Sequence, residues 1–511
     1  MKLLPRYTPP RKSANSKPSG QWIPLLLVLV LATGLYVYQL DTESLWIDEL
    51  YSIKDAEVLA NIAPVRPLYF FLLHIWMQFN LSELWLRLLS IWFGLGTIVF
   101  TYLLGCRVVN QSTGLAAAIL LTLSPLFINH AQEVRFYTLS CFLGVGGSLA
   151  LSYALEESRY IRFAPWGWWV GARLLAMLTT PLNVLLLLPD SLLIIWRLRH
   201  RRRLLFTMGG ILLVIGIISL PWLSQLGEAS INFMGDWVAH EAKPGITSIV
   251  GRLTSFTARW PLRIVGSPLS HFYKLYTVML VGMLGCVPWV LRRYPRLMWV
   301  VIWGFLPGGV LLAVSLLLGP IWLPRYLLFV APYFLILLAA SFLEIVRWQQ
   351  KLAIVIALMY TVAVGSGLHH YYTTSYRADW RGVAQAIREQ EQPGDVIALC
   401  ITNSRPLLAI DYYYHGSAPI EVLEVVKDGC VNTLPQFDSR LWLVYLHTTG
   451  DSQKFQQELQ AQSSVETQQT FSSDLGVNND IELFLLTQDS PSSQLKSTLN
   501  FGSWSPPLEL F

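Results

Sequence analysis

The sequence predicts an α-helical multi-pass membrane protein with a small external α/β domain at its C-terminal end. Of its 511 residues, 53% are hydrophobic and only 14% are charged, which is too apolar for a soluble protein of this size. The apolar residues form long stretches separated by short polar segments, and this pattern ends near residue 376. Composition and its change along the chain therefore define the fold class.

The net charge of +5 does not indicate nucleic-acid binding. The cations gather in short segments between apolar stretches, where the positive-inside bias of membrane proteins explains them. We therefore predict the lipid bilayer as a partner of the chain, and no nucleic acid.

The first apolar stretch, residues 22–40, is long enough to cross a bilayer. Residues 1–21 before it contain several Lys and Arg side chains and no acid, so this basic tail is predicted to be cytoplasmic. No small-residue cleavage site follows before Asp41, and the stretch is predicted to remain as an anchor. The loop after it, which contains Asp48 and Glu49, then faces outward.

About eleven windows are long and apolar enough to span a membrane. They cover residues 22–40, 84–106, 113–129, 136–155, 164–180, 182–196, 204–225, 271–291, 297–318, 323–346 and 351–368. The apolar window 67–79 is too short and is predicted to be an outer-surface or re-entrant helix. With this assignment the basic loops fall on the cytoplasmic side. The outer face carries the loops 41–83, 130–135 and 226–270 and everything after residue 368.

The polar C-terminal part has the pattern of a small α/β domain. A helix is predicted over 379–391, buried strands over 395–400 and 440–446, and a polar helix over 453–460. The predicted organisation is a cytoplasmic tail 1–21, a transmembrane domain 22–370, an external domain 371–488 and a poorly ordered Ser- and Pro-rich tail 489–511. Cys400 and Cys430 lie in the external domain, where a disulfide between them is one open reading.

Two charged residues lie inside apolar windows, where an unpaired charge is costly. Arg173 and Asp190 flank the turn at Thr180-Pro181 at similar depth. We predict that they pair across this helix hairpin and serve stability, not catalysis.

Asp48 and Glu49 are adjacent acids at the outer boundary of the membrane. A carboxylate there can take a proton from an acceptor hydroxyl or hold a divalent metal beside a phosphate. The alternative is that both are solvated surface groups. The residues around them favour the chemical reading.

An ordered series of motifs resembles the membrane glycosyltransferases related to protein O-mannosyltransferases and lipid A aminoarabinose transferases, grouped as glycosyltransferase family 39. The motifs are Leu45-Trp46-x-Asp48-Glu49-x-Tyr51-Ser52, Pro67-Leu68-Tyr69-Phe70-x-Leu72-Leu73-His74, Ser82-Glu83-x-x-x-Arg87-Leu88, Ser124-Pro125 and Gln132-Glu133-x-Arg135-x-Tyr137. The resemblance implies a GT-C fold, a polyprenyl-phosphate-linked sugar as donor and transfer at the outer face of the membrane.

The resemblance also implies roles for particular residues. Asp48 matches the first-loop acid that acts as catalytic base or positions the acceptor, and Glu49 is its supporting neighbour. Glu133 and Arg135 match the second outer loop near the donor phosphate, where developing charge needs a guanidinium or a metal. Glu133 could orient Arg135, bind a metal or contact the sugar. A simple ion pair at a helix end is the alternative.

Three further residues are candidates for substrate binding. Tyr69 is carried over from the second motif. Many relatives have His-Pro-Pro where this chain has Val65-Arg66-Pro67, so Arg66 either meets a phosphate or extends to lipid headgroups. Arg325, at the start of the window 323–346, either reaches an anionic carrier or anchors the helix at the interface.

The sequence hypothesis is a glycosyltransferase of the plasma membrane that moves a sugar from a polyprenyl phosphate to an acceptor on the external, periplasmic side. A single displacement with Asp48 as base would invert the anomeric centre. A requirement for a divalent metal stays open. A transporter or flippase of lipid-linked sugars is the alternative, although we find no inverted repeat with broken helices. A membrane scaffold is a third reading.

Overall fold

The computed structural model describes residues 22–62, 66–156, 163–217, 251, 254–258, 269–317, 322–401, 405–424, 434, 437, 440–446, 457, 459, 464–473 and 480–487. The predicted tails 1–21 and 489–511, most of the predicted helix 453–460 and Cys430 lie outside these residues. Cys400 is disulfide-bonded.

Helices lie in the windows that were predicted to span, and the window 204–225 is described only to residue 217. The elements are α1 (Ile23–Val37), α4 (Glu83–Val108), α5 (Gln111–Thr122), α6 (Pro125–Ala131), α7 (Tyr137–Ala154), α8 (Phe163–Thr179), η3 (Pro181–Leu186), α9 (Leu187–Leu198), helical residues 202–217, α12 (Leu269–Gly285), α13 (Val287–Arg293), α14 (Leu297–Leu317), η5 (Pro324–Val330), α15 (Ala331–Trp348) and α16 (Gln350–Thr373). Among the described residues, six helices are long and apolar enough to cross a membrane, or up to seven if the bent pair α5 and α6 is one span.

Burial separates the centre of the bundle from its periphery. The first turns of α15 are buried on every side, as expected of a helix in the core. By contrast, α12 and α16 expose large apolar side chains such as Val278 and Leu358. Exposed apolar surface of this kind marks a face that contacts lipid or another protein. This distribution is the one expected for a multi-pass membrane protein.

The hairpin of α8 and α9 confirms the predicted pairing of Arg173 with Asp190. Arg173 Nε donates to Asp190 Oδ2 at 2.6 Å and Nη2 donates to Oδ1 at 3.1 Å, and both side chains are fully buried. The indole N–H groups of Trp169 and Trp303 donate to the same carboxylate at 2.7 and 2.8 Å. Arg173 Nη1 donates to the carbonyl of Gly144 at 2.7 Å. This satisfied network joins four helices.

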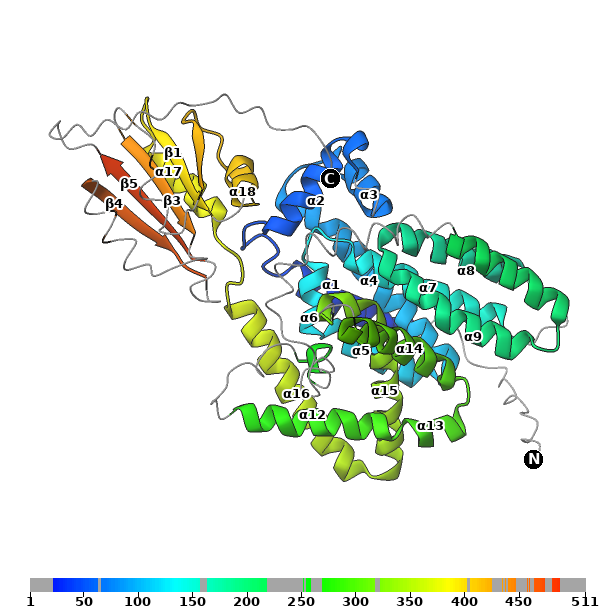
Figure 1. The fold of residues 1–511 in the computed structure, drawn as a ribbon. Coiled ribbons are helices and arrows are strands. Elements are labelled where there is room, and N and C mark those ends of the chain that lie inside the picture. Colours follow the sequence, from blue (N-terminus) through cyan, green and yellow to red (C-terminus); the bar gives the residue numbers. More distant parts are fainter. Residues whose placement is uncertain are drawn as a thin grey trace.

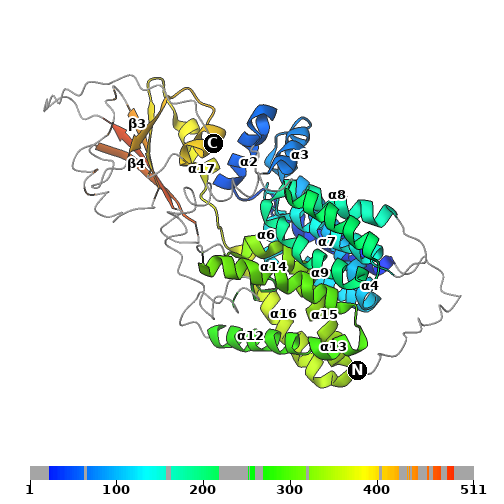
Figure 2. The ribbon, with the colours of Figure 1, turned by 45° about the vertical axis from the view of Figure 1, so that its right-hand side comes forward.

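Two short helices, α2 (Ile47–Glu57) and α3 (Pro67–Met77), lie together at one end of the bundle (Figures 1 and 2). The window 67–79 thus forms a helix of 11 residues, too short to span. The break between α5 and α6 bends the chain by 66° at Ser124-Pro125. Ser124 caps α6 by accepting from the amide of Phe127, and this break directs residues 132–136 towards α2.

A five-stranded sheet follows α16 and has the strand order β2-β1-β3-β5-β4. Its strands and helices are α17 (Trp380–Gln390), β1 (Val396–Ile401), α18 (Arg405–Tyr413), β2 (Ile420–Glu424), β3 (Arg440–Leu446), β4 (Ser464–Phe471) and β5 (Ile481–Thr487). The predicted helix 379–391 and strands 395–400 and 440–446 are confirmed by α17, β1 and β3. Strands β1, β2 and β3 are parallel, whereas β5 is antiparallel to β3 and β4. Figures 1 and 2 place α18 beside α2.

Candidate active site

The adjacent acids Asp48 and Glu49 lie in the first turn of α2, where negative charge is favoured by the helix dipole. Their side chains have opposite surroundings. The Asp48 side chain is 30% exposed, whereas that of Glu49 is completely buried. Only Asp48 is therefore accessible to a substrate.

Two guanidiniums face the Asp48 carboxylate. Its Oδ2 lies 3.7 Å from Arg135 Nη2 and 3.8 Å from Arg325 Nη1. These separations exceed hydrogen-bond length, so both contacts are ion pairs without a direct hydrogen bond. Arg135 is itself fixed, because its Nη1 donates to the Asp48 carbonyl at 2.8 Å and to Ser52 Oγ at 3.0 Å. The backbone around Asp48 thus holds Arg135 while the Asp48 carboxylate stays open.

Arg66 completes a cluster of three arginines. Its guanidinium stacks 4.3 Å above the ring of Phe136, and the Arg135 guanidinium lies 5.3 Å from the same ring. Burial lowers the pKa of Arg66 below its ordinary value, and the nearby charge of Arg135 adds to the shift. For Arg135, burial alone would lower the pKa, but Asp48 and Tyr137 outweigh it and the pKa is raised.

The arginine cluster has unused hydrogen-bonding capacity. The Nε atoms of Arg66 and Arg135 are buried and have no hydrogen-bond partner in the part of the chain that the structure describes. Asp55 interacts with both side chains at longer range, and burial raises the pKa of its carboxyl. Buried guanidinium N–H groups are costly when unpaired. An anion beside this cluster would satisfy them.

A narrow pocket of about 10 Å³, roughly the room of one water molecule, lies next to the cluster. Arg325 contributes both to this pocket and to the ion pair with Asp48. Most of its wall is aromatic or apolar, with a few hydroxyls, and comes from α7, η3 and η5: Phe136, Tyr137, Ser140, Thr180, Leu182, Tyr326, Leu328 and Phe329. The pocket is far smaller than an ordinary ligand site, so a sugar ring would enter it only if these side chains moved apart.

Glu49 is the centre of a buried hydrogen-bond network. Its Oε1 accepts from Arg87 Nε at 3.2 Å and from the amide of Val134 at 2.9 Å. Its Oε2 accepts from Arg87 Nη2 at 3.3 Å, from Arg377 Nη1 at 2.8 Å and from the amide of Trp46 at 3.1 Å. Glu49 thereby connects α2 with α4, with the loop that carries Arg135 and with the segment before α17.

Glu133 and Tyr69 are buried, unlike Asp48. Glu133 accepts from Asn129 Nδ2 at 2.6 Å and is paired with His130 Nδ1 at 2.9 Å. Tyr69 is fully buried, and its hydroxyl lies 3.3 Å from Ser90 Oγ. Ser90 in turn donates to the carbonyl of Arg135 at 3.1 Å. The geometry places both residues where they support the Arg135 loop.

The described residues around Asp48 do not form a site for a divalent metal. Among the described residues no group of three His, Cys, Asp or Glu side chains is arranged to hold a metal ion. A cation at Asp48 would also lie beside Arg135 and Arg325, whose charges oppose it. The positive charge at this position comes from the chain itself.

Sequence reasoning missed Arg377 and gave no role to Arg87 beyond its motif. Arg87 had a usable signal, because it lies inside the apolar window 84–106, where a charge needs a partner. It is 1% exposed and also donates to the carbonyls of Leu40 and Glu43. Arg377 had no such signal, since it lies in a polar segment.

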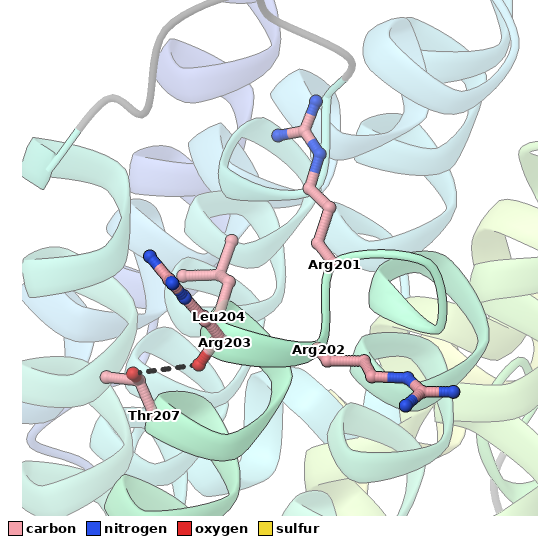
Figure 3. A pocket seen from close by; sticks show the side chains of 5 residues that line it. All are labelled: Arg201, Arg202, Arg203, Leu204 and Thr207. Atoms are coloured by element: carbon pink, nitrogen blue, oxygen red, sulfur yellow. Dashed lines mark hydrogen bonds between the residues drawn. The ribbon is translucent and has the colours of Figure 1, made fainter.

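A second hollow, shown in Figure 3, is lined by Arg201, Arg202, Arg203, Leu204 and Thr207. Its three guanidiniums point in different directions, and Thr207 only bonds back to the carbonyl of Arg203 at 3.0 Å. The arginines therefore do not converge on one ligand. They fit the basic loop predicted for the cytoplasmic side.

No family model and no curated protein matches the sequence. Solved structures do match the fold. ArnT from Cupriavidus metallidurans in the apo state superposes with a TM-score of 0.55 at 13% identity, over 92% of this chain and 98% of that one. The same protein bound to undecaprenyl phosphate gives 0.53 at 12% identity, over 91% and 98%. The apo oligosaccharyltransferase of Archaeoglobus fulgidus gives 0.50 at 11% identity, over 79% and 64%.

These likenesses confirm the fold that the sequence resemblance implied. The chain has the GT-C fold, a helical membrane domain followed by a small C-terminal domain with a sheet. At these identities the structures define the fold alone.

Proposed function

We propose that the protein is a membrane glycosyltransferase that moves a sugar from a polyprenyl-phosphate-linked donor to an acceptor hydroxyl or amine at the outer, periplasmic face. The observation that carries the proposal is the open carboxylate of Asp48, faced by Arg135 and Arg325 beside a narrow pocket with aromatic walls. An acid and a cationic cluster are two components that such a transfer needs.

The arginine cluster supports an anionic lipid donor. Arg66 and Arg135 both offer buried N–H groups that an oxygen-rich anion would satisfy, and arginine binds phosphate through paired charge-assisted hydrogen bonds. The ArnT structure with undecaprenyl phosphate shows that a protein of this fold binds a polyprenyl phosphate. The exposed apolar surface of the bundle supports a donor whose tail stays in the bilayer.

In the proposed reaction the acceptor oxygen or nitrogen forms a bond to the anomeric carbon as the bond from that carbon to the phosphate oxygen breaks. The acceptor proton passes to the Asp48 carboxylate. The bonding electron pair leaves on the polyprenyl phosphate, whose charge Arg135, Arg325 and Arg66 stabilise. A single displacement of this kind inverts the anomeric centre. Glu49, Glu133 and Tyr69 hold the participating groups in place.

The direction across the membrane follows from the basic loops. With the tail 1–21 and the Arg201–Arg203 loop in the cytoplasm, α2, Asp48 and the sheet domain lie on the external side of the plasma membrane. The proposed donor would then be used on the face opposite to the cytosolic nucleotide sugars.

The test is transfer of labelled sugar from total polyprenyl-phosphate sugars to endogenous acceptors in membranes. Wild type is compared with Asp48→Asn and with Asp411→Asn, a matched substitution at an exposed site on α18. Loss of transfer in D48N alone supports the proposal. Normal transfer by D48N removes Asp48 from the mechanism. Movement of sugar lipids across vesicles by wild type, without bond cleavage, would instead favour a transporter.

A further inference from the structure

A set of polar contacts fastens the α/β domain to the first outer loop. Arg381 Nη2 lies 2.7 Å from Glu83 Oε2. Ser44 Oγ donates to Asp379 Oδ1 at 2.9 Å, and the amide of Leu45 donates to the Tyr413 hydroxyl at 2.6 Å. On the sheet domain, these contacts come from α17, from the residue before it and from α18. On the membrane domain, they reach residues 44 and 45, just before α2, and Glu83 at the start of α4. The sheet domain is thus docked against the membrane domain at α2, the helix that carries Asp48 (Figures 1 and 2).

Arg377 makes the deepest of these contacts. Its side chain is 10% exposed, compared with 36% for Arg381. It reaches the fully buried Glu49 at 2.8 Å and also pairs with Glu43 at 3.4 Å. A residue in the linker to the external domain therefore supplies one of the two charges that neutralise Glu49.

Glu49 connects Arg377 with Asp48 and with the loop that carries Arg135. It is the neighbour of Asp48 in the first turn of α2, and it accepts from the Val134 amide next to Arg135. Burial alone would raise the pKa of Glu49, but Arg377 and Arg87 together lower it below its ordinary value. The charged groups that face Glu49 are Arg377 from the linker, Arg87 from α4 and Glu133 from the Arg135 loop.

We infer that the external domain is a positioning element of the Asp48 site, and that Arg377 exerts this effect through Glu49. The expected change in kcat rests on the proposed function. The expected loosening of α2 does not. Without Arg377, Glu49 keeps Arg87 but loses a charge-assisted hydrogen bond, and the first turn of α2 loosens. Asp48 then spends less time aligned with Arg135.

The kinetic test compares Arg377→Gln, Arg377→Lys and Arg388→Gln, the last a matched change at an exposed position on α17. We expect R377Q to lower kcat about ten- to hundredfold, the effect of losing one charged hydrogen bond, with little change in the KM of the donor. R377K restores the charge and should recover part of the loss. R388Q should behave as wild type.

The pH profile separates positioning from a general structural defect. Because the pKa of folded Glu49 is depressed, its contribution is present at neutral pH and is lost as the pH falls through that low value. Loss of the Arg377 charge raises the pKa. The acid limb of the rate profile should therefore move to higher pH in R377Q and return towards wild type in R377K.

Hydrogen–deuterium exchange tests the inference independently of the proposed activity. In nanodiscs, deuterium uptake by peptides covering residues 44–57 should rise in R377Q and stay unchanged in R388Q. Wild-type uptake in R377Q would overturn the inference, whether or not the protein transfers sugar. So would a transfer rate and acid limb in R377Q that match R388Q. If wild type transfers no sugar while R377Q still loosens α2, only the proposed function fails.

Discussion

Two acid–arginine pairs in this molecule show opposite designs. Asp190 is fully buried, lies 2.6 Å from Arg173 and also accepts from two indole N–H groups. Asp48 is partly exposed, and its arginines stand 3.7 and 3.8 Å away beside a narrow pocket. The Asp190 network has every oxygen occupied, whereas the Asp48 cluster retains buried N–H groups without partners among the described residues. A closed network joins helices, and an open one is prepared to receive a charged ligand.

The largest effect is expected at the open pair. Asp48→Asn keeps the size of the side chain but removes the base, and loss of a general base lowers rates by about 10² to 10⁴. Thermal stability should stay near that of wild type, because Asp48 makes only long ion pairs. Transfer of labelled sugar and a thermal melt measure the two properties. A large fall in melting temperature would show that Asp48, like Asp190, serves stability.

Changes to the Arg173–Asp190 pair should instead lower stability. Reversing one charge, with Arg173→Asp or Asp190→Arg, leaves like charges facing in a buried network and should destabilise by about 3–5 kcal/mol. The double reversal should recover more folded protein than either single change. Recovery stays partial, because the Trp169 and Trp303 N–H donors would then face a guanidinium. Monodisperse protein on size-exclusion chromatography is the measurement. No gain in the double variant would contradict the pairing as the source of stability.

Arg325 and Arg201 line different pockets, and their effects on the KM of the donor can be compared. Arg325→Gln removes a guanidinium beside Asp48 and should raise the KM of a polyprenyl-phosphate donor about tenfold, the value of one charge-assisted hydrogen bond. Arg201→Gln changes an arginine whose neighbours point away from it and should leave the KM unchanged (Figure 3). Donor titrations of both variants decide the matter. Equal KM values in the two variants would remove Arg325 from the donor site.

The smallest effect concerns a second closed network, in the sheet domain. Asp395 pairs with Arg440 at 2.7 Å and accepts from the Trp442 indole at 2.9 Å. Burial would raise the pKa of Asp395, but the hydrogen bonds and charge of Arg440 lower it overall. The stabilisation is thus present at neutral pH and lost as the pH falls through the depressed pKa. Arg440→Gln should cost about 1–2 kcal/mol and shift acid unfolding, followed by tryptophan fluorescence, to higher pH. An unchanged acid transition would show that this pair adds nothing.

Much of the scaffold was readable from the sequence. The apolar windows, the short helix within 67–79, the pairing of Arg173 with Asp190 and strand β3 all depend on local hydropathy or on the cost of a charge among apolar residues. Strand β4 was not predicted. Its polar sequence Ser-Val-Glu-Thr-Gln-Gln-Thr-Phe is tolerated at the edge of the sheet, where one side has no partner strand.

The site was only partly readable. The first-loop acid, Arg66, Arg135 and Arg325 were predicted as site residues, and the structure brings the three arginines together around Asp48. The different surroundings of Asp48 and Glu49 could not be foreseen, because neighbours on a helix point about 100° apart and the burial of each depends on what packs there. Tyr69 was expected at the substrate, but its hydroxyl lies in the core against Ser90.

The sequence by itself determined the membrane location of the chain, the order of its helices and the presence of two acids after the first helix, since these follow from residues close together in the chain. Only the tertiary structure decided which acid is open and which is closed. Glu49 is neutralised by Arg377, which is 328 residues away in sequence, and by Arg87 from another helix. Such contacts depend on how distant segments pack, because the partners of a buried charge are set by whatever the fold brings within hydrogen-bonding distance.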